Sequence, residues 1–211
     1  MAKHATGSIL NMRNTLKRTI KNIFLLLTMP LYALYLLLSF LGNPDGTFQT
    51  FSQALSLIPG KMGGYFRAAF YRLTCPDTSD EIAVGFLTVL SHRDTSIHKG
   101  VYIGPQCNIG KCTLGENTLL GSGVHILSGK QQHQFNDPKL PIKEQGGIFK
   151  KIKIGADCWI GNNSVVMCNI AEHSIVAAGA IVTKDLTQQG TVVAGNPAVV
   201  ISHRELEGLS Q

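Results

Sequence analysis

The chain has 211 residues and a formal net charge of +6, and this length suggests one domain plus an appendage. The excess positive charge falls in residues 1–76, which sum to +7, whereas residues 77–211 sum to −1. This asymmetry argues against a main domain that binds nucleic acid and indicates an anionic membrane surface near the N-terminus. The basic residues of the first segment are Lys3, Arg13, Lys17, Arg18, Lys21, Lys61, Arg67 and Arg72.

The five cysteines are odd in number, and no two of them are spaced as CxxC. This usage is typical of reduced, packable side chains in a cytosolic domain rather than of a disulfide framework. The histidines and cysteines also lack the clustered spacing of metal ligands, so we expect no metal site.

A hydrophobic run covers residues 23–41, where IFLLLTMPLYALYLLLSFL holds 19 residues without a charge. The run is long enough for a helix to cross a hydrocarbon core, which takes roughly 20 residues. It does not fit a cleaved signal peptide, whose apolar core would be shorter, and GNPDG offers no small-x-small cleavage site.

Two membrane interpretations of this run remain open. One is a single spanning helix, and the other is a re-entrant or interfacial hairpin that enters and leaves on the same face. Pro30 lies inside the run and would kink a helix, and basic residues flank both ends, which favours the same-face interpretation. Residues 51–73 mix aromatic, aliphatic and basic residues as an interfacial segment does, and residues 48–73 can also cover one end of the main domain. We therefore predict a membrane-associating helical segment over residues 1–76.

Aliphatic residues recur every six positions over most of the remaining chain, and several of them are followed by glycine. Period six fits neither an α-helix nor a long strand, and it predicts an all-β solenoid of short strands that stack one aliphatic residue per repeat. The glycines are expected in turns with unusual backbone angles. The repeat residues are Ile97, Ile103, Ile109, Leu114, Leu120, Ile126, Ile154, Ile160, Val166, Ile170, Val176 and Val182.

The repeats IGPQCN, IGKCTL and IGADCW, followed by IGADCWIGNNSVV, IVAAGAIVTKDL and VVAGNPAVVI, resemble the hexapeptide-repeat acyltransferases over about residues 80–202. The subgroup that these motifs resemble acetylates sugars, antibiotics and cell-surface polysaccharides. The resemblance implies a left-handed parallel β-helix over residues 77–202, an acetyl-CoA donor and a homotrimer. Residues 203–211 are then a C-terminal tail.

The repeat is interrupted once at length, by a polar segment at about residues 127–153. A bare β-helix is a smooth prism, and function tends to lie on loops that a rigid scaffold holds. In the resembling enzymes a loop at this place carries the catalytic histidine, and His133-Gln134-Phe135 fits their pattern. Because imidazole accepts a proton near neutral pH, His133 is the predicted general base for acyl transfer to a hydroxyl. His125, in GVHIL, is the alternative base or an acceptor-contacting residue.

The acceptor-binding candidates are His92, Asn136, Asp137 and Trp159. His92 can equally be an ordinary surface histidine, and Asn136-Asp137-Pro138 is also a turn signal. The resemblance places Trp159 near the donor or the acceptor, although it can also be an aromatic that covers a coil.

The donor-binding candidates follow from the resemblance as well. It implies that Ala178 and Gly179 flank the pantetheine arm, that Lys184 meets the nucleotide phosphates, and that Arg204 and Trp159 add contacts. The coil VVMCNIAEH is two residues short of the family pattern, with Ile170-Ala171 in place of the isoleucine–glycine pair, so the donor groove is expected to be reshaped there.

The predicted function is a membrane-associated, CoA-dependent O-acetyltransferase on the cytoplasmic face of the membrane. Its acceptor would be a sugar hydroxyl of a surface polysaccharide or of a lipid-linked glycan precursor, because an enzyme for a soluble sugar needs no anchor. The alternatives are an N-acyltransferase that acts on an amino sugar and a non-catalytic β-helix scaffold at the membrane.

Overall fold

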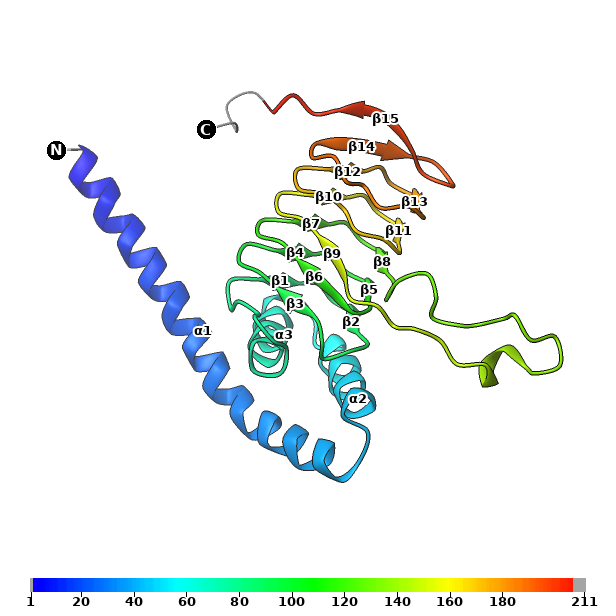
Figure 1. The fold of residues 1–211 in the computed structure, drawn as a ribbon. Helices are drawn as coiled ribbons and strands as arrows, with labels where there is room; N and C mark the ends of the chain where they lie inside the picture. Colours follow the sequence, from blue (N-terminus) through cyan, green and yellow to red (C-terminus); the bar gives the residue numbers. More distant parts are fainter. Residues whose placement is uncertain (1, 207–211) are drawn as a thin grey trace.

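The computed structural model describes the backbone of residues 2–206 and the side chains from Met12 onward. Three helices come first: α1 (Ala2–Leu41), α2 (Pro44–Ser56) and α3 (Gly60–Thr74). The first strand begins at Ala83, and every later strand belongs to one triangular prism (Figure 1). The order of the elements is therefore a helical segment followed by a parallel β-helix.

Helix α1 runs through Pro30 without a break and bends in its second half (Figure 1). A hairpin inside residues 23–41, one of the two membrane interpretations, is therefore wrong. Proline removes one backbone donor and kinks the helix, but the flanking apolar residues pack on α2 and α3 and keep both halves helical. The chain reverses only after Leu41, where the Asn43 side chain caps α2 by accepting hydrogen bonds from the amides of Asp45 and Gly46.

The prism has three faces, which each coil visits in turn. Neighbouring strands within each face pair in parallel until the last pair, β14–β15, which is antiparallel. Face 1 contains β1 (Ala83–Val84), β4 (Tyr102–Ile103), β7 (Leu119–Leu120), β10 (Trp159–Ile160), β12 (Ile175–Val176), β14 (Thr191–Ala194) and β15 (Val199–His203). Face 2 contains β2 (Val89–Leu90), β5 (Asn108–Ile109), β8 (His125–Ile126), β11 (Val165–Val166) and β13 (Ile181–Val182). Face 3 contains β3 (Ser96–Ile97), β6 (Cys112–Leu114) and β9 (Ile152–Ile154), and single bridges at Ile170 and Leu186 extend it.

The period-six residues form the interior of this prism, as predicted. Each of them is at most 2% exposed, and residues of successive coils lie in register, as Ile103 does with Leu120 and Leu120 with Ile160. Each coil thus buries one aliphatic side chain per face, and the hydrophobic stabilisation is spread along the prism axis.

The glycines that follow these residues have a different role from the predicted one. Positive φ angles occur two positions later, at residues such as Gln106 (φ 61°), Asn117 (φ 59°) and Asn163 (φ 57°). A Cβ atom on Gly161 would lie 2.4 Å from the amide nitrogen of Ala178 in the next coil. These glycines are needed because adjacent coils approach too closely for a side chain.

All five cysteines are buried and unpaired. Burial raises the pKa of each thiol, to about 12 for Cys75 and Cys112 and to about 11 for Cys158. Cys107 and Cys168 shift in the same direction for the same reason.

Helices α2 and α3 cover the first end of the prism, and Arg67 joins them to it (Figure 1). Its guanidinium is 1% exposed and donates hydrogen bonds to the carbonyls of Leu55 (2.9 Å), Ile58 (2.8 Å) and Val84 (3.0 Å). Counting Arg67 among the basic residues that face a membrane was therefore wrong, because its charge is used inside the protein. A Cβ on Gly63 would lie 1.8 Å from the Ile58 carbonyl oxygen, so this approach also requires glycine.

Candidate active site

A long loop between β8 and β9 projects away from the prism (Figure 1). Its two arms pair through backbone hydrogen bonds from Lys150 to Ser128 (2.8 Å), from Ile148 to Gln131 (2.7 Å) and from Gln134 to Gly146 (2.9 Å). The loop is therefore an ordered ribbon. It leaves the prism at the corner between faces 2 and 3.

The tip of the loop is held by Gln145, which follows the short 3₁₀ helix η1 (Ile142–Glu144). The Gln145 side chain accepts a hydrogen bond from the Asp137 amide (3.0 Å) and donates to the carbonyls of Asp137 and Leu140 (2.8 Å each). The Asp137 carboxylate accepts from the Lys139 amide at 2.8 Å. Asp137 thus organises a turn, which was one of its two predicted roles, and Asn136 lies exposed beside it.

His133, the predicted base, lies exposed on the outgoing arm of this ribbon. His125, the alternative, lies on β8, also exposed, between Asn108 and Val165 of the neighbouring strands. Both side chains are therefore exposed to solvent.

His92 lies under the returning arm of the loop. Its ring centroid is 5.4 Å from that of Phe149, and its Nδ1 is 2.9 Å from the Ser91 hydroxyl oxygen. Burial lowers the pKa of His92, so its neutral form is favoured at neutral pH. Of the predicted residues, His133 lies on the loop itself and His92 contacts its returning arm.

A cavity of about 300 Å³ lies at the root of the loop, against the segments that follow β11 and β13. Lys130 and Lys150 contribute from the two arms, and Cys168, Asn169 and Asp185 contribute from the prism. Sequence reasoning missed the two lysines, although basic residues at both ends of the interruption, in SGK and FKK, were a signal. Lysine ammonium groups suit an anionic ligand.

The shortened coil is what leaves room beside this cavity. Where the chain steps only four residues from Val166 to Ile170, face 3 is reduced to single bridges, and a second cavity of about 410 Å³ follows it. Asn169 and Asp185 line both cavities, and the Asn169 amide donates to the Asp185 carboxylate at 2.8 Å. The expected reshaping of this region is thus located at the corner that carries the loop.

The predicted donor residues lie at different corners of the chain. Lys184 is exposed next to Asp185, at the same corner as the loop. Ala178 and Gly179 form the turn between β12 and β13, at the opposite edge of face 2, and Gly179 has a φ of 71°. One chain therefore does not gather these residues around one ligand, whereas a site between two chains can use both corners.

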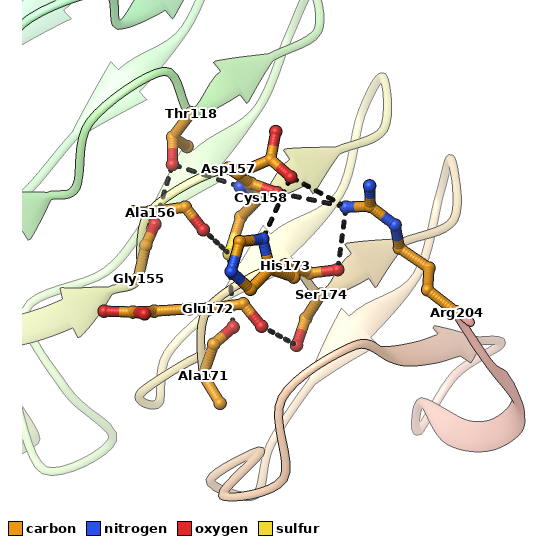
Figure 2. Close-up of polar contacts among 10 residues, drawn as sticks. All are labelled: Thr118, Gly155, Ala156, Asp157, Cys158, Ala171, Glu172, His173, Ser174 and Arg204. Carbon is orange, nitrogen blue, oxygen red and sulfur yellow. Dashed lines mark hydrogen bonds and ion pairs between the residues drawn. The ribbon is translucent and has the colours of Figure 1, made fainter. Parts of the chain in front are cut away.

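Arg204 lies at the third corner and binds protein groups. Its Nη1 donates to the Asp157 carboxylate (3.1 Å) and to the His173 carbonyl (3.0 Å), and the His173 Nδ1 is 3.0 Å from the same carboxylate (Figure 2). Hydrogen bonding from His173 is the main reason that the pKa of Asp157 is lowered. This network fastens the segment after β15 to the prism, and in this arrangement Arg204 does not reach the loop cavity.

Trp159 is 53% exposed on the outer surface of face 1, between Leu119 and Ile175. Tyr102 lies on the far side of Leu119 in the same row and is 45% exposed. Trp159 thus belongs to an outward row of apolar side chains rather than to the root of the loop.

The chain thus combines a prism of hexapeptide coils with one long loop that carries His133. The family model described as bacterial transferase hexapeptide (six repeats) matches residues 94–128. A probable macrolide acetyltransferase of Lysinibacillus sphaericus is 30% identical over 53% of this chain and 67% of its own length. A chloramphenicol acetyltransferase of Agrobacterium fabrum is 27% identical over 68% of this chain and 78% of its own. This chain belongs to the hexapeptide-repeat acyltransferases, as its motifs predicted.

Comparison with a solved structure supports the fold. A maltose O-acetyltransferase from Clostridium difficile 630 superimposes with a TM-score of 0.66 and 21% identity, over 78% of this chain and 90% of its own. The left-handed parallel β-helix expected from the resemblance is thereby confirmed. Other curated relatives are covered over as little as 28% of their own length.

Proposed function

We propose that this protein is a membrane-associated O-acetyltransferase that transfers an acetyl group from acetyl-CoA to a sugar hydroxyl. The acceptor is a surface polysaccharide or its lipid-linked precursor, and the catalytic domain works on the cytoplasmic face of the membrane. The observation that carries this proposal is His133, exposed on an ordered loop that leaves an otherwise continuous hexapeptide prism. Membership of an acyltransferase family supports the reaction class.

The reaction needs a general base and no covalent enzyme intermediate. His133 accepts the proton of the sugar hydroxyl as the hydroxyl oxygen attacks the thioester carbonyl. The protonated imidazole then returns that proton to the departing thiolate. The lysines at the root of the loop and Lys184 supply positive charge for the phosphates of the donor. A galactoside acetyltransferase of similar fold, with a TM-score of 0.53, was solved in complex with coenzyme A, which is consistent with such a donor here.

The loop also supports a homotrimer with sites between subunits. Phe135 is 74% exposed, Ile142 56% and Ile148 55%, on a ribbon that extends off its own prism. Apolar side chains gathered on an extended loop are stable when another surface covers them. A neighbouring prism can cover them and bring its own corner to the loop. Full activity at a monomeric mass in detergent would contradict this assembly.

Thiol release from acetyl-CoA tests the proposal, with membrane-extracted lipid-linked glycans as the acceptor. We expect His133→Ala to lower the rate by about 10²–10⁴-fold, the usual contribution of a general base, with binding of acetyl-CoA intact. His98→Ala, which removes a histidine paired with Asp77 away from the loop, is the matched control. Activity that survives His133→Ala and falls with His125→Ala would assign the base to His125. Absence of thiol release and of acetyl-CoA binding in the unaltered protein would refute the proposed enzyme activity.

A further inference from the structure

Helix α1 is unusually apolar and unusually uncovered. Over Met12–Leu41 it is long and apolar enough to cross a membrane, yet only 11% of its most apolar stretch is buried inside the protein. Its outward side chains include Leu26 (72% exposed), Phe40 (88%) and Leu41 (72%). Such a surface is stable only against lipid or against another apolar surface.

One side of α1 is fixed along its length to the rest of the protein. The Phe24 ring packs on those of Tyr65 and Phe66 at 5.0 and 4.9 Å, and the Tyr35 ring meets those of Phe51 and Phe70 at 5.7 and 5.6 Å. These contacts leave the opposite side of the helix as the apolar surface. The helix is therefore attached to α2 and α3 sideways rather than by one end.

Both ends of the apolar run are tied to the first coil of the prism. Near the start, Arg18 donates to the Asp80 carboxylate at 2.7 Å, just before β1. Just past the end, Asp45 accepts a hydrogen bond from the Arg93 amide at 3.2 Å, just after β2. Residues 18 and 35 are about 26 Å apart along a helix, so a spanning α1 would carry its attached partners across most of a core of about 30 Å.

Those partners are not suited to hydrocarbon. Helix α2 presents Gln49 and Gln53 to solvent on its free side, and the ion pair of Arg18 with Asp80 belongs to the same part of the protein. Polar side chains without partners cost several kcal/mol in a bilayer core. The attached geometry therefore disfavours a spanning helix.

We infer that α1 lies in the plane of the membrane, with its free apolar side buried shallowly among the lipids and both ends on the same side. The partner is an anionic bilayer surface, because Arg13 and Lys17 are exposed on the same helix just before the apolar run, and cations close to a bilayer are attracted to anionic head groups. An interfacial helix of this kind is buried about 5–10 Å into the boundary between head groups and acyl chains. This inference rests on the membrane association in the proposed function and deepens it, since it fixes the topology that the sequence left open.

A depth profile along α1 tests the inference on the full-length protein. Leu16→Cys, Ile23→Cys, Leu34→Cys and Leu41→Cys each place one thiol on the free side, and the native cysteines are buried. Each variant receives a bimane label in vesicles of phosphatidylcholine and phosphatidylglycerol in equal amounts, with nitroxide quenchers near the head group or deep in the chains. Thr187→Cys, exposed beyond β13, is the matched control and should not be quenched.

We expect head-group quenchers to act more strongly than deep ones at all four α1 positions. A membrane-impermeant thiol reagent added outside should then reach unlabelled Leu16→Cys and Leu41→Cys from the same side. Deep quenching that peaks at the middle positions, with the two ends accessible from opposite sides, would overturn the inference and leave the membrane-associated enzyme standing. No quenching at any position would overturn membrane association itself, whereas thiol release from acetyl-CoA tests the acyltransferase separately.

Discussion

Arg67→Met is expected to destabilise the joint between the helices and the prism severely. A hydrogen bond to a charged group contributes about 1.5–3 kcal/mol, and a buried carbonyl left without a donor costs about 1–3 kcal/mol. Arg67 serves three carbonyls, those of Leu55, Ile58 and Val84. Burial lowers the pKa of Arg67, a sign that the charge is desolvated, and removing it offsets part of the loss. The expected loss of unfolding free energy is about 3–5 kcal/mol.

Urea unfolding in detergent, followed by circular dichroism, measures this loss. Lys61→Met is the matched control, because Lys61 is exposed on the same helix and surface substitutions usually stay within about 0.5 kcal/mol. Limited proteolysis locates the effect, which should appear in α1 to α3 before the prism. An Arg67→Met protein as stable as the Lys61→Met protein would show that the three hydrogen bonds do not hold the joint.

Three further predictions concern the prism, its third corner and the loop. Gly161→Ala places a Cβ atom 2.4 Å from the Ala178 amide nitrogen and should cost about 1–3 kcal/mol of unfolding free energy. Gly64→Ala, in α3, would place its Cβ 3.9 Å from the Val84 carbonyl oxygen and should be neutral or stabilise by up to about 1 kcal/mol; equal effects would contradict the packing argument. The lowered pKa of Asp157 means that its stabilising contribution is complete above the unfolded value of about 3.9 and is lost as the pH falls through the folded value. Acid titration of thermal stability should therefore show the difference between the unaltered protein and Asp157→Asn shrinking below about pH 4, and a difference independent of pH would count against the network. Gln145→Ala should speed proteolysis within residues 127–151 without changing the unfolding midpoint, because Gln145 holds only the loop tip; Glu144→Ala, on the adjacent 3₁₀ turn, should leave the cleavage rate unchanged.

The prism was predictable because stacked coils bury aliphatic side chains at equivalent positions, which gives the sequence its period of six. Ile103, Leu120 and Ile160 occupy equivalent places in successive coils, and each place admits only a buried aliphatic side chain. The role of the glycines that come directly after these residues could not be predicted from the sequence. Close approach of the next backbone and a left-handed turn both require glycine, and a linear sequence does not distinguish the two causes.

The helical segment shows a different limit. Its composition indicated the membrane, but the pairing of Arg18 with Asp80 and the burial of Arg67 depend on contacts 62 and 17 residues away along the chain. Charges counted from a sequence are counted as free, whereas tertiary packing decides which of them reach the surface.

The candidate site was predictable only in part for a similar reason. His133 stood out because it interrupts a regular pattern, and Asp137 was recognisable as a turn residue. Arg204 was predicted to bind the donor from the family resemblance alone. Its hydrogen bonds to Asp157 and His173 arise because three segments meet at one corner. Lys130 and Lys150 come together only because the two arms of the loop pair.

The burial of every cysteine bears on the proposed reaction, which consumes a thioester and releases a free thiol. Only a thiolate attacks a thioester or a disulfide readily, and a thiol with a pKa of about 12, as at Cys75 and Cys112, holds almost no thiolate at neutral pH. In the proposed acetyltransferase, thiols of this kind would resist acylation by the thioester donor.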